Sequence, residues 1–418
     1  MRGLAIGADR ALYVAASQRG GSRLGQAAAD REQLVLARVV AGQVGWTRII
    51  DAGAGPVAAS AELVVAAVSG TGSVRVDTAA LPVRGNPGAA LLGLAPASGD
   101  TRWATGVGAT EWVVVAALAA RPGGGVVLAG SFAGTLRVGD HVVSAAGGSD
   151  GFVAAVDGSG RPLWLVRAGG DGADGFTAVA ADTDFIAAVG AVTGDADVGG
   201  VPVAGTDDQT LAPDVLVAGL GADGAPRWAQ AVGGEAEDAA AGVVITGDGV
   251  VVGATSRGVV TRVGQDLGLE VGGAADALVV RFDRAGRALG AALVGGTDYD
   301  GARALVARPG GATLFGWFAG TLPGGGTGAG LIADGGDDAF AAELDAGGAL
   351  LGAATDRDRS ALSGAGREEI TAAASGADTQ AIAVSYSNRA RVFGVDLPAP
   401  AQPLAGAALV VRAVAPPR

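Results

Sequence analysis

An internal repeat of about 60 residues constrains the fold of this chain more than any other feature. One register of the repeat holds Trp in four successive copies and Gly in the next two. The register positions are Trp46, Trp103, Trp164, Trp228, Gly290 and Gly352. A Gly stands four residues before each of them, and an Asp stands fourteen residues before each of the last four. Because three residue types keep one period, we conclude that the chain repeats one supersecondary unit.

Each copy is predicted to form four short β-strands. Runs rich in Val, Phe and Leu are separated by Gly, Asp and Pro, and long amphipathic helical patterns are absent. In the fourth copy the strands, called A to D, are predicted at residues 176–180, 185–190, 215–220 and 227–232. The A–B pair and strand C recur seven times. Strand D recurs six times, because the sequence reaches Arg418 before a seventh copy.

Four-stranded units in four to eight copies close radially into a β-propeller. We therefore predict an all-β fold, a seven-bladed β-propeller of four-stranded antiparallel blades, with a last blade of three strands. A single domain is expected to span residues 1–418. Its repeat units are predicted at about 1–52, 53–109, 110–170, 171–234, 235–296, 297–356 and 357–418.

Several copies resemble the bacterial SBBP-type β-propeller repeat. Residues 148–170 read GSDGFVAAVDGSGRPLWLVRAGG, and residues 128–139 read LAGSFAGTLRVG. That family shows an Asp-Ala-Phe-Val strand, an Asp-x-x-Gly turn, a Trp strand and a Gly-Gly pair. The resemblance extends over essentially the whole chain and is clearest from residue 126 to residue 345. It implies a seven-bladed propeller, common in exported or surface proteins, and it supplies no shared catalytic residues.

Charge and composition exclude several classes of function. The chain has 42 acidic residues against 29 basic ones, all Arg, and its net charge is −13. This balance argues against a nucleic-acid partner, which requires a basic surface. Cys is absent, which excludes disulfides, thiolate metal sites and a Cys nucleophile. The one His, His141, follows Asp140 in a predicted turn, so we expect no metal or catalytic role for it.

Hydropathy, the N-terminal sequence and the family resemblance bear on compartment and assembly. No apolar run reaches the ~18–20 residues that span a bilayer, so we expect no membrane span. Asp9 and Arg10 interrupt the apolar stretch that a signal peptide would need. The family resemblance implies an extracellular or cell-surface protein, whereas this sequence alone also fits a cytoplasmic one. We expect a monomer.

The Trp residues are interpreted as structural. Because the strand-D Trp series keeps one strand position, we expect these side chains to pack between adjacent blades. Trp112 and Trp317 lie outside that register. They either pack in the core, which we favour, or face the channel.

Acidic residues gather in the connections from strand D to the next strand A. The regular set is Asp171, Asp174, Glu235, Glu237, Asp238, Asp298 and Asp300, and the less regular copies add Asp51, Glu111, Asp356, Asp358, Glu368 and Glu369. In a propeller these connections emerge on one face, so we predict an acidic rim there.

Two interpretations of the rim remain open. We favour a structural role, in which Asp174, Asp238 and Asp300 accept hydrogen bonds from backbone N–H groups of the interblade turn. Alternatively, the regular set forms a ligand face for a cation or a basic ligand. In that case Ca²⁺ suits the oxygen ligands, and the same three aspartates are the candidate metal ligands.

The predicted function is a non-catalytic binding or scaffold propeller that engages a protein or polysaccharide ligand through one face. No cofactor is expected apart from the candidate Ca²⁺. The alternative is a carbohydrate-active enzyme that uses carboxylates of the acidic face. Because His, Lys and Cys are absent or nearly so, we favour the binding role. A desolvated carboxylate pair in a pocket would instead favour the enzyme.

Overall fold

A computed structural model describes most of the chain. The described residues are 2–18, 32–206, 212–247, 249–263, 265–323, 330–333, 337–345, 347–353, 362–364, 368–386, 390–392, 395–397 and 406–414. They contain β-strands and turns but no α-helix. No part of this described chain therefore provides a helix long and apolar enough to cross a membrane.

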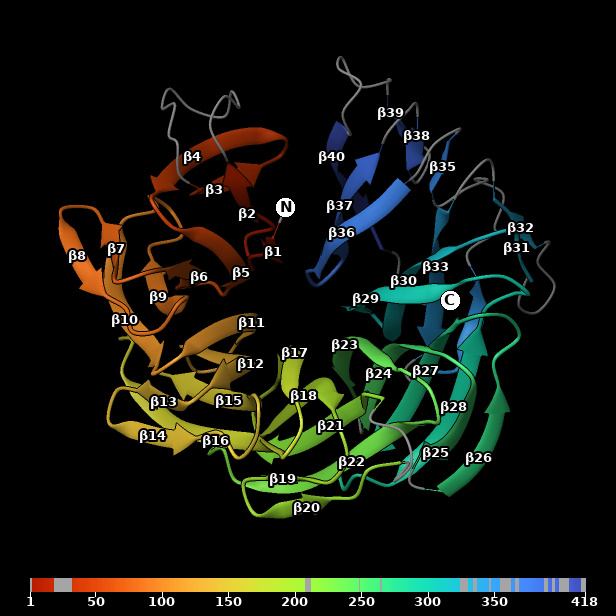
Figure 1. Ribbon diagram of the computed structural model, residues 1–418. Helices are drawn as coiled ribbons and strands as arrows, with labels where there is room; N and C mark the ends of the chain where they lie inside the picture. Colours follow the sequence, from red (N-terminus) through yellow and green to blue (C-terminus); the bar gives the residue numbers. More distant parts are fainter. Residues whose placement is uncertain are drawn as a thin grey trace. The chain divides into compact units, whose positions relative to one another are not determined.

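The fold is a seven-bladed β-propeller, as predicted (Figure 1). Its contacts cluster in two compact units, residues 1–203 with 218–229 and residues 204–217 with 230–418. The single-domain organisation of residues 1–418 stays a prediction.

Three whole blades lie in the first unit. In the order A to D, the first blade consists of β1 (Gly3–Ile6), β2 (Leu12–Gln18), β3 (Gln33–Val40) and β4 (Gln43–Ile50). The second consists of β5 (Gly53–Ala59), β6 (Val64–Gly70), β9 (Gly88–Leu94) and β10 (Thr101–Ala109). The third consists of β11 (Trp112–Ala120), β12 (Val126–Ala133), β15 (Asp150–Val156) and β16 (Pro162–Gly170). The fourth blade consists of β17 (Gly175–Ala181), β18 (Phe185–Val192), β21 (Asp214–Gly221) and β22 (Pro226–Gly234). The boundary between the units runs through its last two strands.

The second unit holds the remaining three blades. The fifth blade consists of β23 (Ala239–Thr246), β24 (Gly249–Ser256), β27 (Asp276–Asp283) and β28 (Ala288–Val294). The sixth consists of β29 (Gly301–Arg308), β30 (Gly311–Phe318), β33 (Asp338–Asp345) and β34 (Leu350–Ala353). The seventh consists of β36 (Glu368–Ser375), β37 (Thr379–Tyr386) and β40 (Gly406–Ala413). Strand C occurs seven times, as predicted. The three-stranded last blade is confirmed.

The connection between strands B and C contains a hairpin that the sequence analysis did not predict. These hairpins are β7–β8 (Ser73–Val76, Ala79–Pro82), β13–β14 (Thr135–Val138, His141–Ser144), β19–β20 (Ala196–Val198, Val201–Val203), β25–β26 (Val259–Val263, Gln265–Glu270), β31–β32 (Thr321–Leu322, Leu331–Ile332) and β38–β39 (Ala390–Val392, Val395–Leu397). β13 pairs with β10, and β19 pairs with β16, the D strands of the preceding blades. The pairing covers edges that would otherwise expose unpaired backbone groups.

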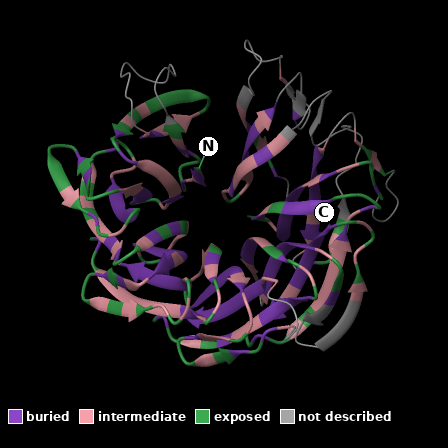
Figure 2. Ribbon diagram, viewed as in Figure 1, coloured by how far each residue is buried: buried purple, intermediate pink, exposed green. Residues whose placement is uncertain are grey.

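The core lies along strands B and C of each blade. Figure 2 shows buried residues concentrated in these middle strands, whereas intermediate and exposed residues are more frequent in the flanking strands and hairpins. Every residue of β9, β15 and β21 is buried. Continuous burial is expected of a strand covered on both faces, and the small Ala and Val side chains allow neighbouring sheets to approach.

The Trp series packs between blades, as predicted, in the first unit. The ring of Trp164 lies against Gly224 in the C–D turn of the next blade, where an added Cβ would come within 2.4 Å of Cδ2. The indole N–H of Trp164 donates to the carbonyl oxygen of Ala222 at 3.3 Å. Trp46 and Trp103 make the same contacts with the following blades. Each Trp therefore requires a Gly, which explains why the two residue types share one period.

We expect Trp164→Ala to lower the free energy of unfolding by about 2–3 kcal/mol. This is less than the loss of ~3–5 kcal/mol typical of a fully buried aromatic, because Trp164 is half-buried. Trp164→Phe, which keeps most of the ring contact and loses the indole hydrogen bond, should cost about 1 kcal/mol. Denaturant unfolding of both variants measures the difference. An unchanged midpoint for Trp164→Ala would contradict the interblade role.

Candidate functional site

The acidic residues predicted for the D–A connections separate into two groups. Asp174, Asp238 and Asp300 are buried, with exposed fractions of 3, 1 and 0%. Asp171, Glu235, Glu237 and Asp298 are exposed. The buried residues are the ones that fall ten positions after the repeat register, so the regular part of the pattern marks interior positions.

The buried aspartates accept backbone hydrogen bonds across the connection. Asp174 accepts the N–H of Gly170 at 2.7 Å and the N–H of Thr193 at 2.8 Å. Asp300 accepts the N–H groups of Gly296 and Ala319 in the same way, and Asp238 accepts that of Gly234 at 3.2 Å. These contacts agree with the favoured structural interpretation, because they satisfy N–H groups that the change of direction removes from the sheet.

Each buried aspartate also faces the Asp that begins strand C of the preceding blade. The three pairs are Asp150 with Asp174, Asp214 with Asp238, and Asp276 with Asp300. A Gly-Gly dipeptide at the end of strand D lies beside each pair. A Cβ on Gly233 would fall 2.2 Å from Asp214 Oδ1 and 2.4 Å from Asp238 Oδ2. The glycines therefore give the two carboxyl groups room to approach.

Three carboxyl oxygens in these pairs are buried without a hydrogen-bond partner among the described residues. They are the Oδ1 atoms of Asp150, Asp238 and Asp276. A buried, unpartnered carboxylate oxygen is costly, and protonation removes that cost. Burial accordingly raises the pKa of Asp174, Asp276 and Asp300.

The pKa of Asp238 shows the largest of these effects. It is raised to about 7, chiefly by burial and in part by the negative charge of Asp214. The Ser256 hydroxyl faces Asp238 and opposes the rise, although no hydrogen bond of normal geometry joins that hydroxyl to Oδ1. We conclude that Asp238 holds a proton in the folded chain up to near-neutral pH.

The raised pKa values predict a fold that is more stable in mild acid than in base. Between pH ~4 and ~7 the folded chain keeps protons that the unfolded chain releases, so the free energy of unfolding should fall as the pH rises. A shift from the ordinary value of 3.8 to about 7 corresponds to a loss on the order of 4 kcal/mol for Asp238 alone.

Urea unfolding at pH 5 and pH 8 measures this loss. Asp238→Asn, whose side chain is neutral at both pH values, should be more stable than the unsubstituted chain at pH 8 and should show a shallower pH dependence. A free energy of unfolding that stays constant or rises between pH 5 and pH 8 would contradict the assignment.

The Gly-Gly contact predicts a specific sensitivity to substitution. Gly233→Ala should lower the free energy of unfolding by at least about 2 kcal/mol, because the new methyl group would overlap both carboxyl groups. Gly290→Ala is the matched control, since nothing lies within 4 Å of its added Cβ. Thermal unfolding compares the two variants, and equal midpoints would show that the pair tolerates a side chain.

The metal and ligand roles of the acidic residues stay predictions. The described residues contain no group of three or more His, Asp or Glu placed to hold a metal ion. The rim that would unite Asp171 with Glu235 and Asp298 spans both compact units, so it too stays a prediction. Of the less regular copies, Asp356 and Asp358 lie outside the described residues, and the side chain of Glu368 is not described.

The buried pairs are poorly suited to catalysis. Desolvated carboxylate pairs were the feature expected of the enzymatic alternative. However, all six carboxyl groups are at most 3% exposed. A general acid or nucleophile must touch its substrate, and these groups face the backbone of the interblade corner instead.

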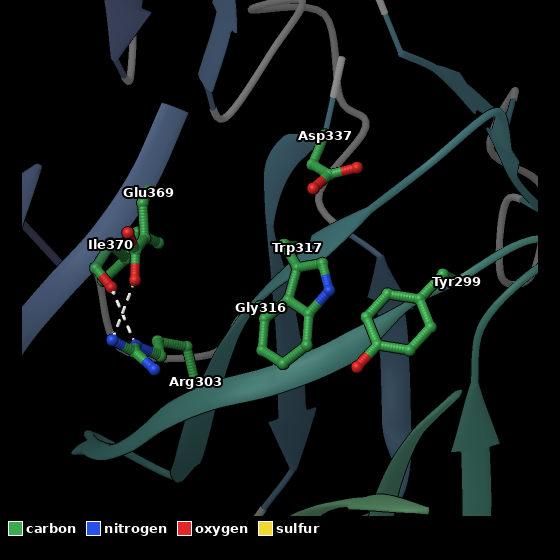
Figure 3. A pocket seen from close by; sticks show the side chains of 7 residues that line it. All are labelled: Tyr299, Arg303, Gly316, Trp317, Asp337, Glu369 and Ile370. Carbon is green, nitrogen blue, oxygen red and sulfur yellow. Dashed lines mark hydrogen bonds and ion pairs between the residues drawn. The ribbon is translucent and has the colours of Figure 1, made fainter. Parts of the chain in front are cut away.

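A separate hollow in the second unit is lined by aromatic and charged side chains. It has a volume of about 200 Å³ and is lined by Tyr299, Arg303, Gly316, Trp317, Asp337, Glu369 and Ile370. Tyr299 comes from the connection that ends at Asp300, Trp317 from β30 and Glu369 from β36. Figure 3 shows the Trp317 ring between Tyr299 on one side and the Arg303–Glu369 pair on the other.

The two aromatic rings form one surface of this hollow, which we call the aromatic pocket. The centroids of Tyr299 and Trp317 lie 6.2 Å apart. Trp317 is half-buried, and 39% of Tyr299 is exposed. The favoured core position of Trp317 is thus wrong in this respect, because the ring packs on Gly301 but also lines an open pocket.

Ion pairs join charged side chains in the pocket lining and next to it. Arg303 donates to Glu369 Oε1 at 2.8 Å and to the carbonyl oxygen of Ile370 at 3.2 Å. Arg257 donates to Glu237 at 2.9 Å and to the Tyr299 hydroxyl at 2.7 Å. The described residues give Asp337 no ion-pair or hydrogen-bond partner. The pocket therefore combines an aromatic surface with a surplus negative charge.

Similarity to known proteins is found among solved structures. No protein-family model matches the chain, and no curated protein matches it. Among solved structures it is similar to the crystal structure of BamB from Moraxella catarrhalis, with a TM-score of 0.40 and 14% sequence identity, over 94% of this chain and 93% of that one. This similarity is too low to assign a function.

Proposed function

We propose that this chain is a non-catalytic binding propeller of the SBBP-type repeat family, and that its ligand site is the aromatic pocket. The ligand is a protein or a polysaccharide. The family assignment rests on the Asp, Gly and Trp register and on the quoted segments. Such a role suits an exported or surface protein.

The observation that carries the proposal is the exposed position of Tyr299 and Trp317. Aromatic residues make up 4% of the chain, and seven Phe side chains are among its largest fully buried groups. Two large rings placed together at an open hollow are therefore an exception to the pattern of this sequence. Aromatic side chains that remain accessible beside polar groups are typical of binding sites.

The charged residues of the pocket favour ligand binding over catalysis of glycoside hydrolysis. Glu369 is already paired with Arg303 at 2.8 Å, and Asp337 is the remaining acidic wall. Glycoside hydrolysis requires two carboxyl groups that both reach the scissile bond, one acting as an acid. A carboxylate committed to a guanidinium is a poor proton donor.

A binding screen tests the proposal. Immobilised bacterial oligosaccharides and acidic, neutral and basic pentapeptides serve as probes. We expect the unsubstituted chain to bind members of one class, and Trp317→Ala to weaken that binding about thirtyfold, as for a central aromatic contact. Trp112→Ala, which removes the other half-buried Trp outside the register, is the matched control and should bind normally.

Two results would overturn the proposal. Binding that Trp317→Ala leaves intact, with the variant folded by circular dichroism, would remove the pocket from the ligand site. Release of shorter sugars from an oligosaccharide probe would instead favour the carbohydrate-active enzyme.

A further inference from the structure

We propose that the aromatic pocket binds the cationic side chain of a protein partner, an Arg guanidinium or a Lys ammonium group. This inference rests on the proposed function and specifies its ligand. It derives from the size of the pocket, the charge of its walls and the arrangement of its rings.

The size of the pocket limits its occupant to one small group. A volume of about 200 Å³ is below the ~300–1,000 Å³ of typical small-molecule sites. One extended side chain or one sugar ring fits such a space, whereas a longer saccharide segment would have to lie mostly outside. The charge and polarity of that one side chain or sugar ring therefore determine which ligand binds.

The charge of the walls favours a cation. Within the lining, Glu369 pairs with Arg303. Outside the lining, Arg257 is paired with Glu237. Among the described residues no opposite charge pairs with the carboxylate of Asp337, and Asp298, directly before Tyr299, is exposed. A neutral sugar would gain little from this surplus, and an anion would be repelled. A cation gains from it directly, especially where water is partly excluded.

The aromatic surface favours the same ligand. Cations bind over aromatic faces, and Trp gives the strongest attraction. The structure already contains this contact, because the guanidinium carbon of Arg257 lies 5.6 Å from the ring centroid of Tyr299 while its Nη2 donates to the hydroxyl. Trp317, next to Tyr299, offers the incoming cation a better ring beside the carboxylate of Asp337.

The chain itself contains no Lys, and its net charge is −13. Electrostatic steering would bring a basic partner toward such a surface and would weaken as salt is added. A single cationic side chain inserted between an aromatic face and a carboxylate would act as the anchor of that interface.

The test uses Nα-acetyl-arginine amide as the probe, with the neutral isostere Nα-acetyl-citrulline amide and methyl β-glucoside for comparison. Titrations follow the indole N–H resonance of Trp317 by NMR, assigned through its absence in Trp317→Phe. We expect the arginine compound to shift this resonance saturably, and the two neutral compounds to leave it in place. Asp337→Asn should weaken the arginine binding about tenfold, and added salt should weaken it further.

Asp140→Asn is the matched control, since it removes one exposed carboxylate in the first unit and should leave the titration unchanged. A shift caused by the glucoside but not by the arginine compound would overturn this inference and leave the proposed function standing. No shift with any probe would contradict both. Arginine binding unaffected by Asp337→Asn would overturn the inference that the carboxylate of Asp337 holds the cation against Trp317.

Discussion

Three of the corners between successive blades depend on a buried carboxyl group, that of Asp174, Asp238 or Asp300. Where strand D ends and the chain turns into the next strand A, the backbone leaves N–H groups without a sheet partner, and a buried N–H group requires an acceptor. Asp174 and Asp300 each supply two such acceptors, one toward the Gly-Gly segment and one toward the end of the next strand B. One side chain thereby joins two blades.

The corner at Asp300 also determines where the aromatic pocket lies. Asp300 is fully buried, so the residues directly before it must leave the interior. Tyr299 consequently stands at the surface beside Trp317, where it receives Arg257 from the neighbouring blade. The aromatic pocket is therefore a consequence of the structural corner. A change that loosened Asp300 would be expected to displace Tyr299 as well.

Most of the fold could be predicted from the sequence, because the contacts that hold the blades recur with the repeat. The Trp–Gly contact between blades fixes two positions of the repeat in the first unit, and the first residue of strand C is marked by Asp in four copies. The hairpins between strands B and C escaped prediction because their strands are as short as two residues, such as Thr321–Leu322. In sequence, segments this short cannot be distinguished from turns.

Less of the candidate site could be predicted. The position of Asp238 marks a regular corner, but the sequence alone cannot show that Asp214 faces it, because that proximity arises from neighbouring blades. Trp317 lies in a strand that is otherwise buried, so its pattern indicates the core. Tyr299 offered one signal, since it is one of three Tyr residues and lies between Asp298 and Asp300. Its partners Arg257 and Trp317 come from other strands.

The protonation of the paired carboxyl groups tests the account of the interblade corner most directly. The ¹³C resonances of the aspartate side-chain carboxyl carbons, followed from pH 3 to pH 9, report each group separately. We predict that Asp238 titrates near pH 7, with Asp174, Asp276 and Asp300 also above the ordinary range. If all four groups ionise at or below the ordinary pKa of 3.8, the corners are held by unprotonated carboxylates and the account is wrong.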